Sequence, residues 1–334
     1  MAKASRHRHW SWAFFLLGIA AVHGVGQSAA EEAPEAREIL EQMGEALRRH
    51  SYDGTFVYTR EGVMETLRIV RSADGERGRE RIYALSGRAW EVFRGADQAL
   101  TVMGGESDAG SAHLPALAGI AFRRGKPRVD GDLGEHYRIT LVGEDRLADR
   151  AAWVVAIEPT DRLRYGHRFW IDQETHLPLQ AQVRDGEEVL ERLFCTRLEV
   201  GDTVTERRLE SQLKLSPAVR ERLGRAGGNT VESGPTTWRV VNLPPGFRLA
   251  MEGRFQAPEL EGEGGDAAVE HLLFSDGLAH VSVYVVRQEE GRAGRMRLGS
   301  LHAVERPVNG YQMTVLGDVP PETVERFADG VRRR

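Results

Sequence analysis

The 334-residue chain has a single cysteine, Cys195. One thiol cannot form an intramolecular disulfide, so the fold must be stabilised by hydrophobic cores. Cys195 lies in the strand-like segment LERLFCTRLEV, which favours a buried, inert thiol over a nucleophile. We therefore expect a structural role for this side chain.

The chain also lacks an excess of positive charge, because its formal net charge is −5. Loss of Lys3, Arg6 and Arg8 with a leader peptide would make the remainder more acidic still. A general nucleic-acid binder needs a concentrated positive field. The composition therefore excludes nucleic acid as the expected partner.

Catalytic and cofactor motifs are missing or incomplete. GESDA at 105–109 has alanine where a nucleophile elbow needs its second glycine, and EGEGG at 261–265 lacks the nucleotide-binding fingerprint. The histidines do not have the close spacing of a metal motif. We expect a protein that is not an enzyme and has no metal or cofactor.

No long apolar run occurs that could span a membrane. The longest, at 13–22, has about half of the ~20 residues needed. Basic residues precede it and Ser28-Ala29-Ala30 follows it, a pattern typical of a secretory leader. We predict a signal peptide at 1–30, a mature chain from Glu31, and export as a soluble protein.

The mature chain is long enough for two domains. The best boundary is GRAGGNTVESGP at 224–235, which is rich in glycine and polar residues and has no apolar periodicity. We predict a larger domain at 31–223, a linker at 224–235 and a smaller domain at 236–334.

Periodicity predicts the elements of both domains. A helix should begin near Pro34, followed by alternating strands that glycines interrupt at hairpin-like distances. The second part should contain hairpins at Asp276-Gly277 and Asn309-Gly310. A last helix should follow Pro320-Pro321, with apolar residues Val324, Phe327, Ala328 and Val331 on one face. The fold class is α+β, with a large curved antiparallel sheet and a smaller α+β unit.

The segment between Met103 and Val129 interrupts the strand pattern. It is loop-like at first and then apolar. It could form a mobile helical lid over an open sheet or a helix that permanently covers the core. Both alternatives remain open from the sequence.

The segment at 144–172 is the most informative one, because it pairs two strands across an arginine-rich connection. Guanidinium groups bind carboxylate and phosphate and stack on aromatic rings. Arg162, Arg164 and Arg168 are therefore candidates for an exposed site that binds an acidic headgroup or peptide. The alternative is an ordinary hairpin with a solvated basic face.

Aromatic residues recur in the alternating strands of the larger domain. Such side chains must point either into a cavity or outward, and they are candidates for the lining of a cavity that binds acyl chains. The candidates are Phe56, Tyr58, Tyr83, Trp90, Phe93, Trp153, Phe169 and Trp170.

Several blocks of this sequence closely resemble the RseB/MucB family of periplasmic regulators. In the larger domain they are YDGTFVYTREGVMETLRIV at 52–70, ERIYALSGRAWEVFR at 80–94 and the segment at 145–183. In the smaller domain they are WRVVNLPPGF at 238–247, VEHLLFSDGLAHVSVYV at 269–285 and VLGDVPPETVERFAD at 315–329. The blocks occur in family order along nearly the whole mature chain.

The resemblance implies a non-enzymatic periplasmic regulator of an envelope-stress sigma factor. Such a protein binds the periplasmic segment of a transmembrane anti-sigma factor, hinders its regulated proteolysis, and is released by mislocalised lipopolysaccharide or a related lipid. The larger domain would then resemble the lipoprotein carriers, an open antiparallel barrel with covering helices around an apolar cavity.

The smaller domain is the expected site of partner binding, since a carrier alone would not need it. The candidate surface is the sheet around His271, Tyr284 and Tyr311, with Trp238 and Phe247 supporting it from the core. Rival functions are a lipid or lipoprotein carrier without a regulatory partner and a secreted hydrolase. A homo-oligomer is also left open.

Overall fold

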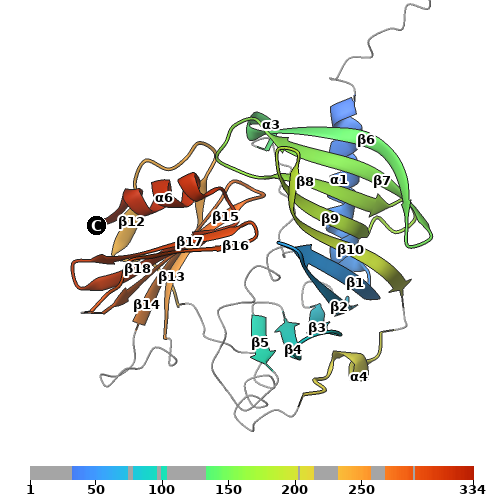
Figure 1. The fold of residues 1–334 in the computed structure, drawn as a ribbon, viewed down its shortest axis with the longest axis horizontal. Coiled ribbons are helices and arrows are strands. Elements are labelled where there is room, and N and C mark those ends of the chain that lie inside the picture. Colours follow the sequence, from blue (N-terminus) through green and yellow to red (C-terminus); the bar gives the residue numbers. More distant parts are fainter. Residues whose placement is uncertain are drawn as a thin grey trace, which may run out of the picture.

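The chain folds into two antiparallel sheets that lie side by side, as Figure 1 shows for a computed structural model. The structure describes residues 32–73, 78–95, 99–103, 133–201, 204–213, 232–256, 268–288 and 290–334. The last strand of the larger sheet ends at Val200, and the first strand of the smaller sheet begins at Glu232.

The larger sheet has ten strands in the order β5-β4-β3-β2-β1-β10-β9-β8-β7-β6. Consecutive strands pair as hairpins, and one long-range pair, β1 with β10, joins the two halves. The end strands β5 and β6 do not pair with each other, so within the described residues the sheet is open. The strands are β1 (Tyr52–Arg60), β2 (Val63–Ser72), β3 (Arg79–Ala84), β4 (Trp90–Arg94), β5 (Ala99–Met103), β6 (Tyr137–Leu147), β7 (Arg150–Pro159), β8 (Gly166–Asp172), β9 (Pro178–Asp185) and β10 (Glu188–Val200).

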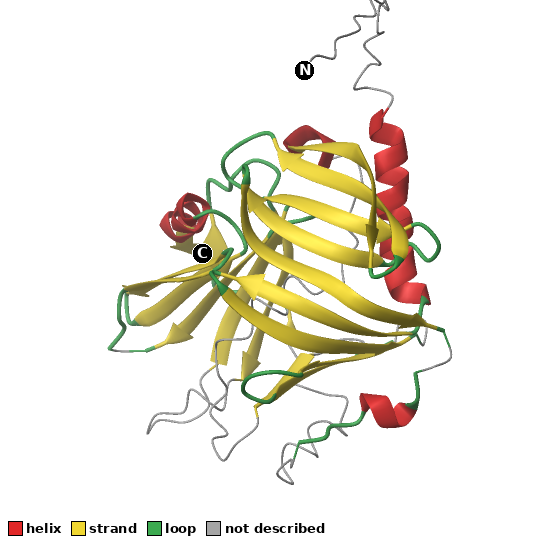
Figure 2. Cartoon of the chain, turned by 45° about the vertical axis from the view of Figure 1, so that its right-hand side comes forward, coloured by secondary structure: helices red, strands yellow, loops and turns green. Residues whose placement is uncertain are grey.

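Helix α1 (Glu32–Arg49) packs along one face of this sheet, which we call the helix side (Figure 2). Its apolar residues recur at helical spacing and enter two buried clusters. Leu40 and Met43 pack with Val155 and Ile157, whereas Ala46 joins the cluster around Phe56. Two short helices, α3 (Leu133–His136) and α4 (Glu206–Leu209), flank the sheet.

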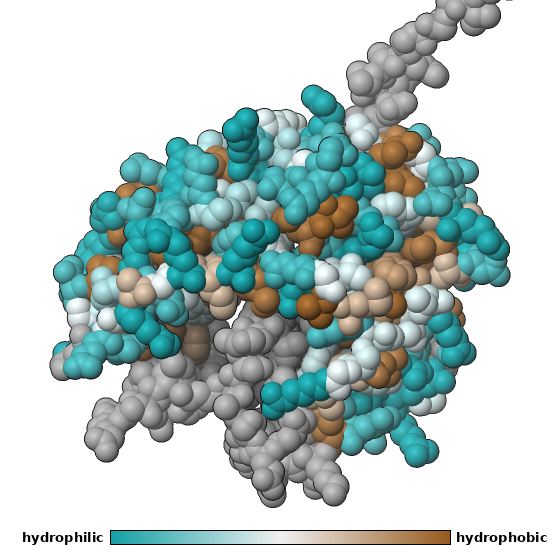
Figure 3. All heavy atoms as spheres, viewed as in Figure 1, coloured by the Kyte–Doolittle hydropathy of each residue, from teal (hydrophilic) through white to brown (hydrophobic). Residues whose placement is uncertain are grey.

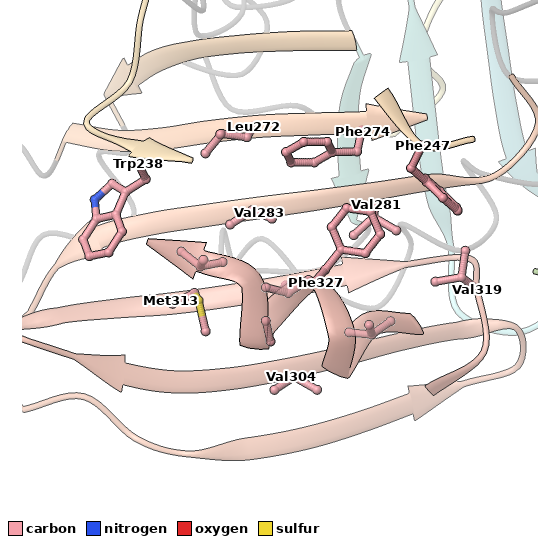
Figure 4. Close-up of a cluster of buried hydrophobic side chains, with 14 of the residues drawn as sticks. Trp238, Phe247, Leu272, Phe274, Val281, Val283, Val304, Met313, Val319 and Phe327 are labelled. Carbon is pink, nitrogen blue, oxygen red and sulfur yellow. The ribbon is translucent and has the colours of Figure 1, made fainter. Parts of the chain in front are cut away.

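The smaller sheet has seven strands in the order β11-β13-β14-β15-β18-β17-β16, and helix α6 (Pro321–Gly330) covers one face. Phe327 of α6 packs on Phe247 and Phe274 in the core shown in Figure 4. A separate two-stranded pair closes the chain end. The strands are β11 (Glu232–Ser233), β12 (Trp238–Val240), β13 (Arg248–Gln256), β14 (Ala268–Ser275), β15 (His280–Arg287), β16 (Gly294–Leu298), β17 (Leu301–Val308), β18 (Tyr311–Gly317) and β19 (Val331–Arg333).

These elements confirm the predicted fold class. The β17–β18 turn has positive φ at both Asn309 and Gly310, the geometry of a primed hairpin turn. In the β14–β15 turn only Gly277 has positive φ, because the connection is longer. Val331 was expected in the last helix, but it begins β19 and pairs with Val240.

Three predicted segments lie wholly or mainly outside the described residues. They are the leader at 1–30, the interruption between Met103 and Val129, and most of the linker at 224–235. The domain boundaries therefore stay predictions. None of the helices in the described part of the chain is long and apolar enough to cross a bilayer.

Candidate functional site

The candidate aromatic residues of the larger sheet divide between its two faces. Directly paired residues share a face, and neighbours along a strand point to opposite faces. Five of the candidates lie on the helix side by this register, namely Phe56, Tyr58, Trp90, Trp153 and Phe169. The other three, Tyr83, Phe93 and Trp170, lie on the outer side by this register, although Trp170 also packs against the cluster that contains Phe56. The candidates therefore divide between the two faces, and a cavity lined by some of them stays a prediction.

The helix-side aromatics are mostly buried. Phe56, Tyr58 and Trp90 belong to the apolar cluster that also contains Leu67 and Ile69. Trp153 and Phe169 are half-buried and pack against the cluster under α1. An apolar lining on this face remains a prediction.

Two of the outer-side aromatics bind a buried arginine instead. The Arg81 guanidinium lies 4.1 Å from the Tyr83 ring centroid and 6.0 Å from that of Phe93. It also pairs with Glu91 at 2.5 Å and donates to the backbone oxygen of Arg208. These contacts attach the chain around α4 to the outer side, so Tyr83 and Phe93 have a structural role here.

The expected exposed arginine cluster does not form. Arg162 is exposed and Arg168 is half-buried on β8, but the Arg164 side chain is fully buried. Arg164 donates to Asp161, to Asp276 at 2.8 Å and to the carbonyl oxygen of Pro245 at 2.7 Å. The prediction was wrong for Arg164 because two of its partners, Asp276 and Pro245, lie in the connections of the smaller sheet, far away in sequence.

Asp276 is the centre of this contact between the two sheets. One carboxylate oxygen accepts the backbone N–H groups of Leu278 and Ala279, which fixes the β14–β15 turn. The other accepts Arg164 and the Tyr137 hydroxyl at 2.9 Å. Burial, and then the charge of Asp276, raises the pKa of Tyr137 well above its usual range. The phenol therefore remains a hydrogen-bond donor.

Glu191 of β10 forms the second polar centre between the sheets. Its carboxylate accepts the Tyr58 hydroxyl at 2.7 Å, and the backbone N–H and hydroxyl of Ser300 at 2.6 and 2.8 Å. Burial is the largest influence and raises the pKa of this carboxyl. Gly299 has φ +63, and a Cβ there would lie 2.3 Å from the Glu191 carboxylate. Glycine is thus required for this close approach.

These contacts all lie where strands of the larger sheet begin or end, along one side of the sheet that we call the docked rim. It consists of the strand ends near Tyr137, Arg164, Glu191 and the β1–β2 turn at Glu61. The turns at one end of the smaller sheet meet it, and Thr323 of α6 donates to the carbonyl oxygen of Leu163. The two sheets are therefore joined by specific buried hydrogen bonds.

The three partner-binding candidates do not share one surface. His271 and Tyr284 are paired across β14 and β15, and their rings stack at 4.3 Å. Tyr311 pairs with Arg287 on the opposite face and packs edge-on against Trp238 at 5.4 Å. The grouping was wrong for Tyr311, whereas Trp238 and Phe247 are core residues as expected.

His271 is buried, and burial lowers the pKa of its imidazole to about 4. Its ring nitrogen lies 3.1 Å from the Ser282 hydroxyl. The imidazole is therefore neutral near pH 7. The half-buried Tyr284 therefore stacks on a neutral imidazole.

Few large apolar side chains are exposed among the described residues. Figure 3 shows apolar residues in small groups separated by hydrophilic ones on the face in view. The exposed large apolar side chains are Val63, Met64, Leu85, Val142, Leu249 and Met296.

Burial raises the pKa of the Cys195 thiol to about 12, in line with an inert side chain. Among the described residues no group of three or more His, Cys, Asp or Glu could hold a metal ion.

Sequence reasoning missed the polar centres at Asp276 and Glu191. The sequence marks Asp276 only as a turn residue, and Glu191 is one charged residue within a predicted strand. Their partners lie 112 and 109 residues away, at Arg164 and Ser300. No local pattern signals such a pair.

Both parts of the chain match family models. The model described as the MucB/RseB N-terminal domain matches residues 35–213. The model described as the MucB/RseB C-terminal domain matches residues 232–332. Together they span nearly all of the described residues.

Curated relatives and solved structures agree with these matches. The sigma factor AlgU regulatory protein MucB of Pseudomonas aeruginosa is 32% identical over 91% of this chain and 92% of its own length. The sigma-E factor regulatory protein RseB of Escherichia coli K12 is 26% identical over 91% and 92%. The solved complex of Pseudomonas aeruginosa MucA and MucB is 29% identical, covers 90% of this chain and 99% of its own, and gives a TM-score of 0.66.

Proposed function

Since the chain belongs to the MucB/RseB family of sigma-factor regulatory proteins, we propose that it binds the periplasmic segment of a transmembrane anti-sigma factor and protects that segment from regulated proteolysis. It would thereby act as a negative regulator of an envelope-stress sigma factor, working in the periplasm. The protein acts by binding rather than by catalysis.

The observation that carries the proposal is the match of both domains in one continuous chain. The relatives named as sigma-factor regulators are matched over more than nine-tenths of their length. A related MucB has been crystallised with MucA(peri), and that structure covers 90% of this chain. A carrier without a regulatory partner would need only the larger sheet.

The second part of the proposal is an acylated ligand at the helix side of the larger sheet. Phe56 and Trp90 belong to a buried apolar cluster on this side, and the half-buried Phe169 packs against a second one. Burial of an acyl chain contributes about 0.8 kcal/mol per methylene, so a single chain suffices for measurable affinity. Lipopolysaccharide or a related lipid on this face would release the anti-sigma segment.

The contact surface for the anti-sigma segment is the face of the smaller sheet that bears His271 and Tyr284. This face lies opposite α6, and its half-buried residues include Leu273 and Leu316. Aromatic side chains on a rigid sheet bind with little loss of conformational entropy. Tyr311 is excluded from this surface because it packs on the α6 side.

The test is calorimetric titration of the anti-sigma periplasmic segment into the full-length mature protein. We expect binding by the wild type, and at least about tenfold weaker binding by Tyr284→Ala. Tyr311→Phe is the control on the opposite face and should bind normally. Added lipopolysaccharide should weaken binding, whereas a pure carrier would bind lipid and not the segment.

Two results would contradict the proposal. No binding of the segment by the wild-type protein would refute the regulatory function. Normal binding by a folded Tyr284→Ala variant would move the contact surface away from this face. In a companion assay, a protease that cleaves the anti-sigma segment should act more slowly when the protein is bound.

A further inference from the structure

A row of four polar residues crosses the larger sheet at the rim opposite the docked rim. Tyr52 of β1 pairs with Arg71 of β2, Arg71 with Glu80 of β3, and Glu80 with Arg94 of β4. Directly paired residues share a face. Because Tyr52 belongs to the apolar cluster with Phe56, the whole row lies on the helix side.

The charges of this row do not balance. The Glu80 carboxylate accepts Arg94 at 3.0 Å, which leaves the Arg71 guanidinium without a carboxylate partner among the described residues. Arg71 is only 8% exposed, and its Nε is buried without a hydrogen-bond partner. A buried charge without a partner is costly, and folded proteins rarely retain one.

The Tyr52 hydroxyl is likewise buried without a hydrogen-bond partner. Its side chain is 2% exposed, and the phenol oxygen has no hydrogen-bond partner within the part of the chain that the structure describes. Tyr52 is directly paired with Arg71, and burial and then the nearby Glu80 carboxylate raise the pKa of its phenol, whereas Arg71 lowers it. Two buried donors therefore lie side by side without an acceptor.

Apolar rows lie directly beside these donors. The next row on the helix side contains Ile69, Ile82 and Val92, and the one after it contains Leu67 and Trp90. From Tyr52 to Tyr58 this face extends about 20 Å along β1, at roughly 3.4 Å per residue. Donors at one end of an apolar face match the shape of an anionic amphiphile.

We propose that Arg71 and Tyr52 bind the anionic headgroup, a carboxylate or phosphate, of an acylated ligand whose chain lies along the helix side. This rests on the acyl-binding part of the proposed function. The guanidinium presents two parallel N–H donors to such an anion, and the phenol adds a third. The headgroup site therefore lies at Arg71, away from the connection that carries Arg162 and Arg168.

The experiment uses the full-length mature protein and four probes below their micelle concentrations. Dodecyl phosphate and dodecanoate carry the two candidate anions, dodecanol carries the same chain without charge, and inorganic phosphate lacks the chain. Binding is measured by calorimetry, and thermal melts with and without each probe give an independent readout. The variants are Arg71→Gln, Tyr52→Phe and the control Arg197→Gln, an exposed arginine of β10.

We expect the wild type to prefer at least one anionic probe over dodecanol by about tenfold or more. Arg71→Gln should reduce this preference to about twofold or less, with dodecanol binding unchanged, and Tyr52→Phe should reduce it partly. Arg197→Gln should behave as the wild type. The preferred probe identifies the headgroup as phosphate or carboxylate.

The remaining outcomes each overturn a distinct statement. No binding of any chain probe would refute the acyl-binding part of the proposed function. Equal binding of anionic probes and dodecanol would refute only the headgroup site. A parallel loss of all probes in Arg71→Gln would assign Arg71 to packing. Inorganic phosphate binding as tightly as dodecyl phosphate would assign the site to a free anion.

Discussion

Each rim of the larger sheet has a buried arginine, and the two arginines differ in their hydrogen-bond and ion-pair partners. At the docked rim, Arg164 is fully buried and donates to two carboxylates and a backbone carbonyl. At the opposite rim, Arg71 is nearly as buried and has no ion-pair partner among the described residues. Burial alone therefore does not define the role of a charge. Arg164 joins two parts of the fold, whereas Arg71 is available for a ligand.

The largest contrast should come from removing each arginine. Arg164→Met leaves Asp276 buried with only Tyr137 as a side-chain donor, so we expect the free energy of unfolding to fall by about 3–5 kcal/mol. Arg71→Met removes a charge that has no partner, and the ligand-free protein should be at least as stable as the wild type. Urea unfolding followed by tryptophan fluorescence measures both. A loss of similar size in Arg71→Met would contradict the contrast.

A smaller contrast should separate two tyrosines of the same strand. Tyr58 donates to the buried Glu191 carboxylate, whereas the Tyr52 hydroxyl has no partner in the described structure. Hydrogen bonds to a charged group contribute about 1.5–3 kcal/mol, so Tyr58→Phe should lose that amount. Tyr52→Phe should change the stability of the ligand-free protein very little. Equal losses in the two variants, measured by the same unfolding experiment, would show that Tyr52 does have a partner.

The smallest expected effect is the pH dependence that Glu191 gives to the docked rim. Because burial raises the pKa of this carboxyl above its unfolded value, the folded protein binds more protons than the unfolded chain between the two values. Stability should therefore fall as the pH rises through this window and then level off. Glu191→Gln should remove the slope.

Urea midpoints of the wild type and Glu191→Gln at a series of pH values from about 4 to 7 test this prediction. Glu80→Gln at the opposite rim is the matched control, since Glu80 pairs with Arg94 and lies away from the smaller sheet. A slope that persists unchanged in Glu191→Gln would mean that other carboxyl groups produce it.

Local sequence patterns were sufficient for most of the fold. Apolar spacing after Pro34 predicts α1, and the Asn309-Gly310 dipeptide predicts a hairpin, because both signals act within a few residues. The β1–β10 pair could not be found in this way. Tyr58 and Glu191 are 133 residues apart, and nothing near either one identifies the other.

The site was less predictable than the fold for the same physical reason. Alternation assigned the aromatics to strands, but only the register shows that Tyr83 lies on the outer side while Phe56 lies on the helix side. Composition favoured an exposed Arg164, yet Asp276 neutralises it from another sheet. No sequence pattern marks Arg71, because its missing carboxylate partner can be recognised only in the folded protein.

The β1–β10 pair also determines how the larger sheet must assemble. Hairpins form within about 1–10 μs, whereas joining β1 to β10 closes a loop of more than a hundred residues, and such non-local pairing slows folding. Until β1 and β10 pair, each of them has one edge with unpaired backbone groups, and such edges promote aggregation. The turn at Gly299 and Ser300 bonds to Glu61 beside β1 and to Glu191 on β10, so docking of the smaller sheet adds hydrogen bonds to both strands of this non-local pair.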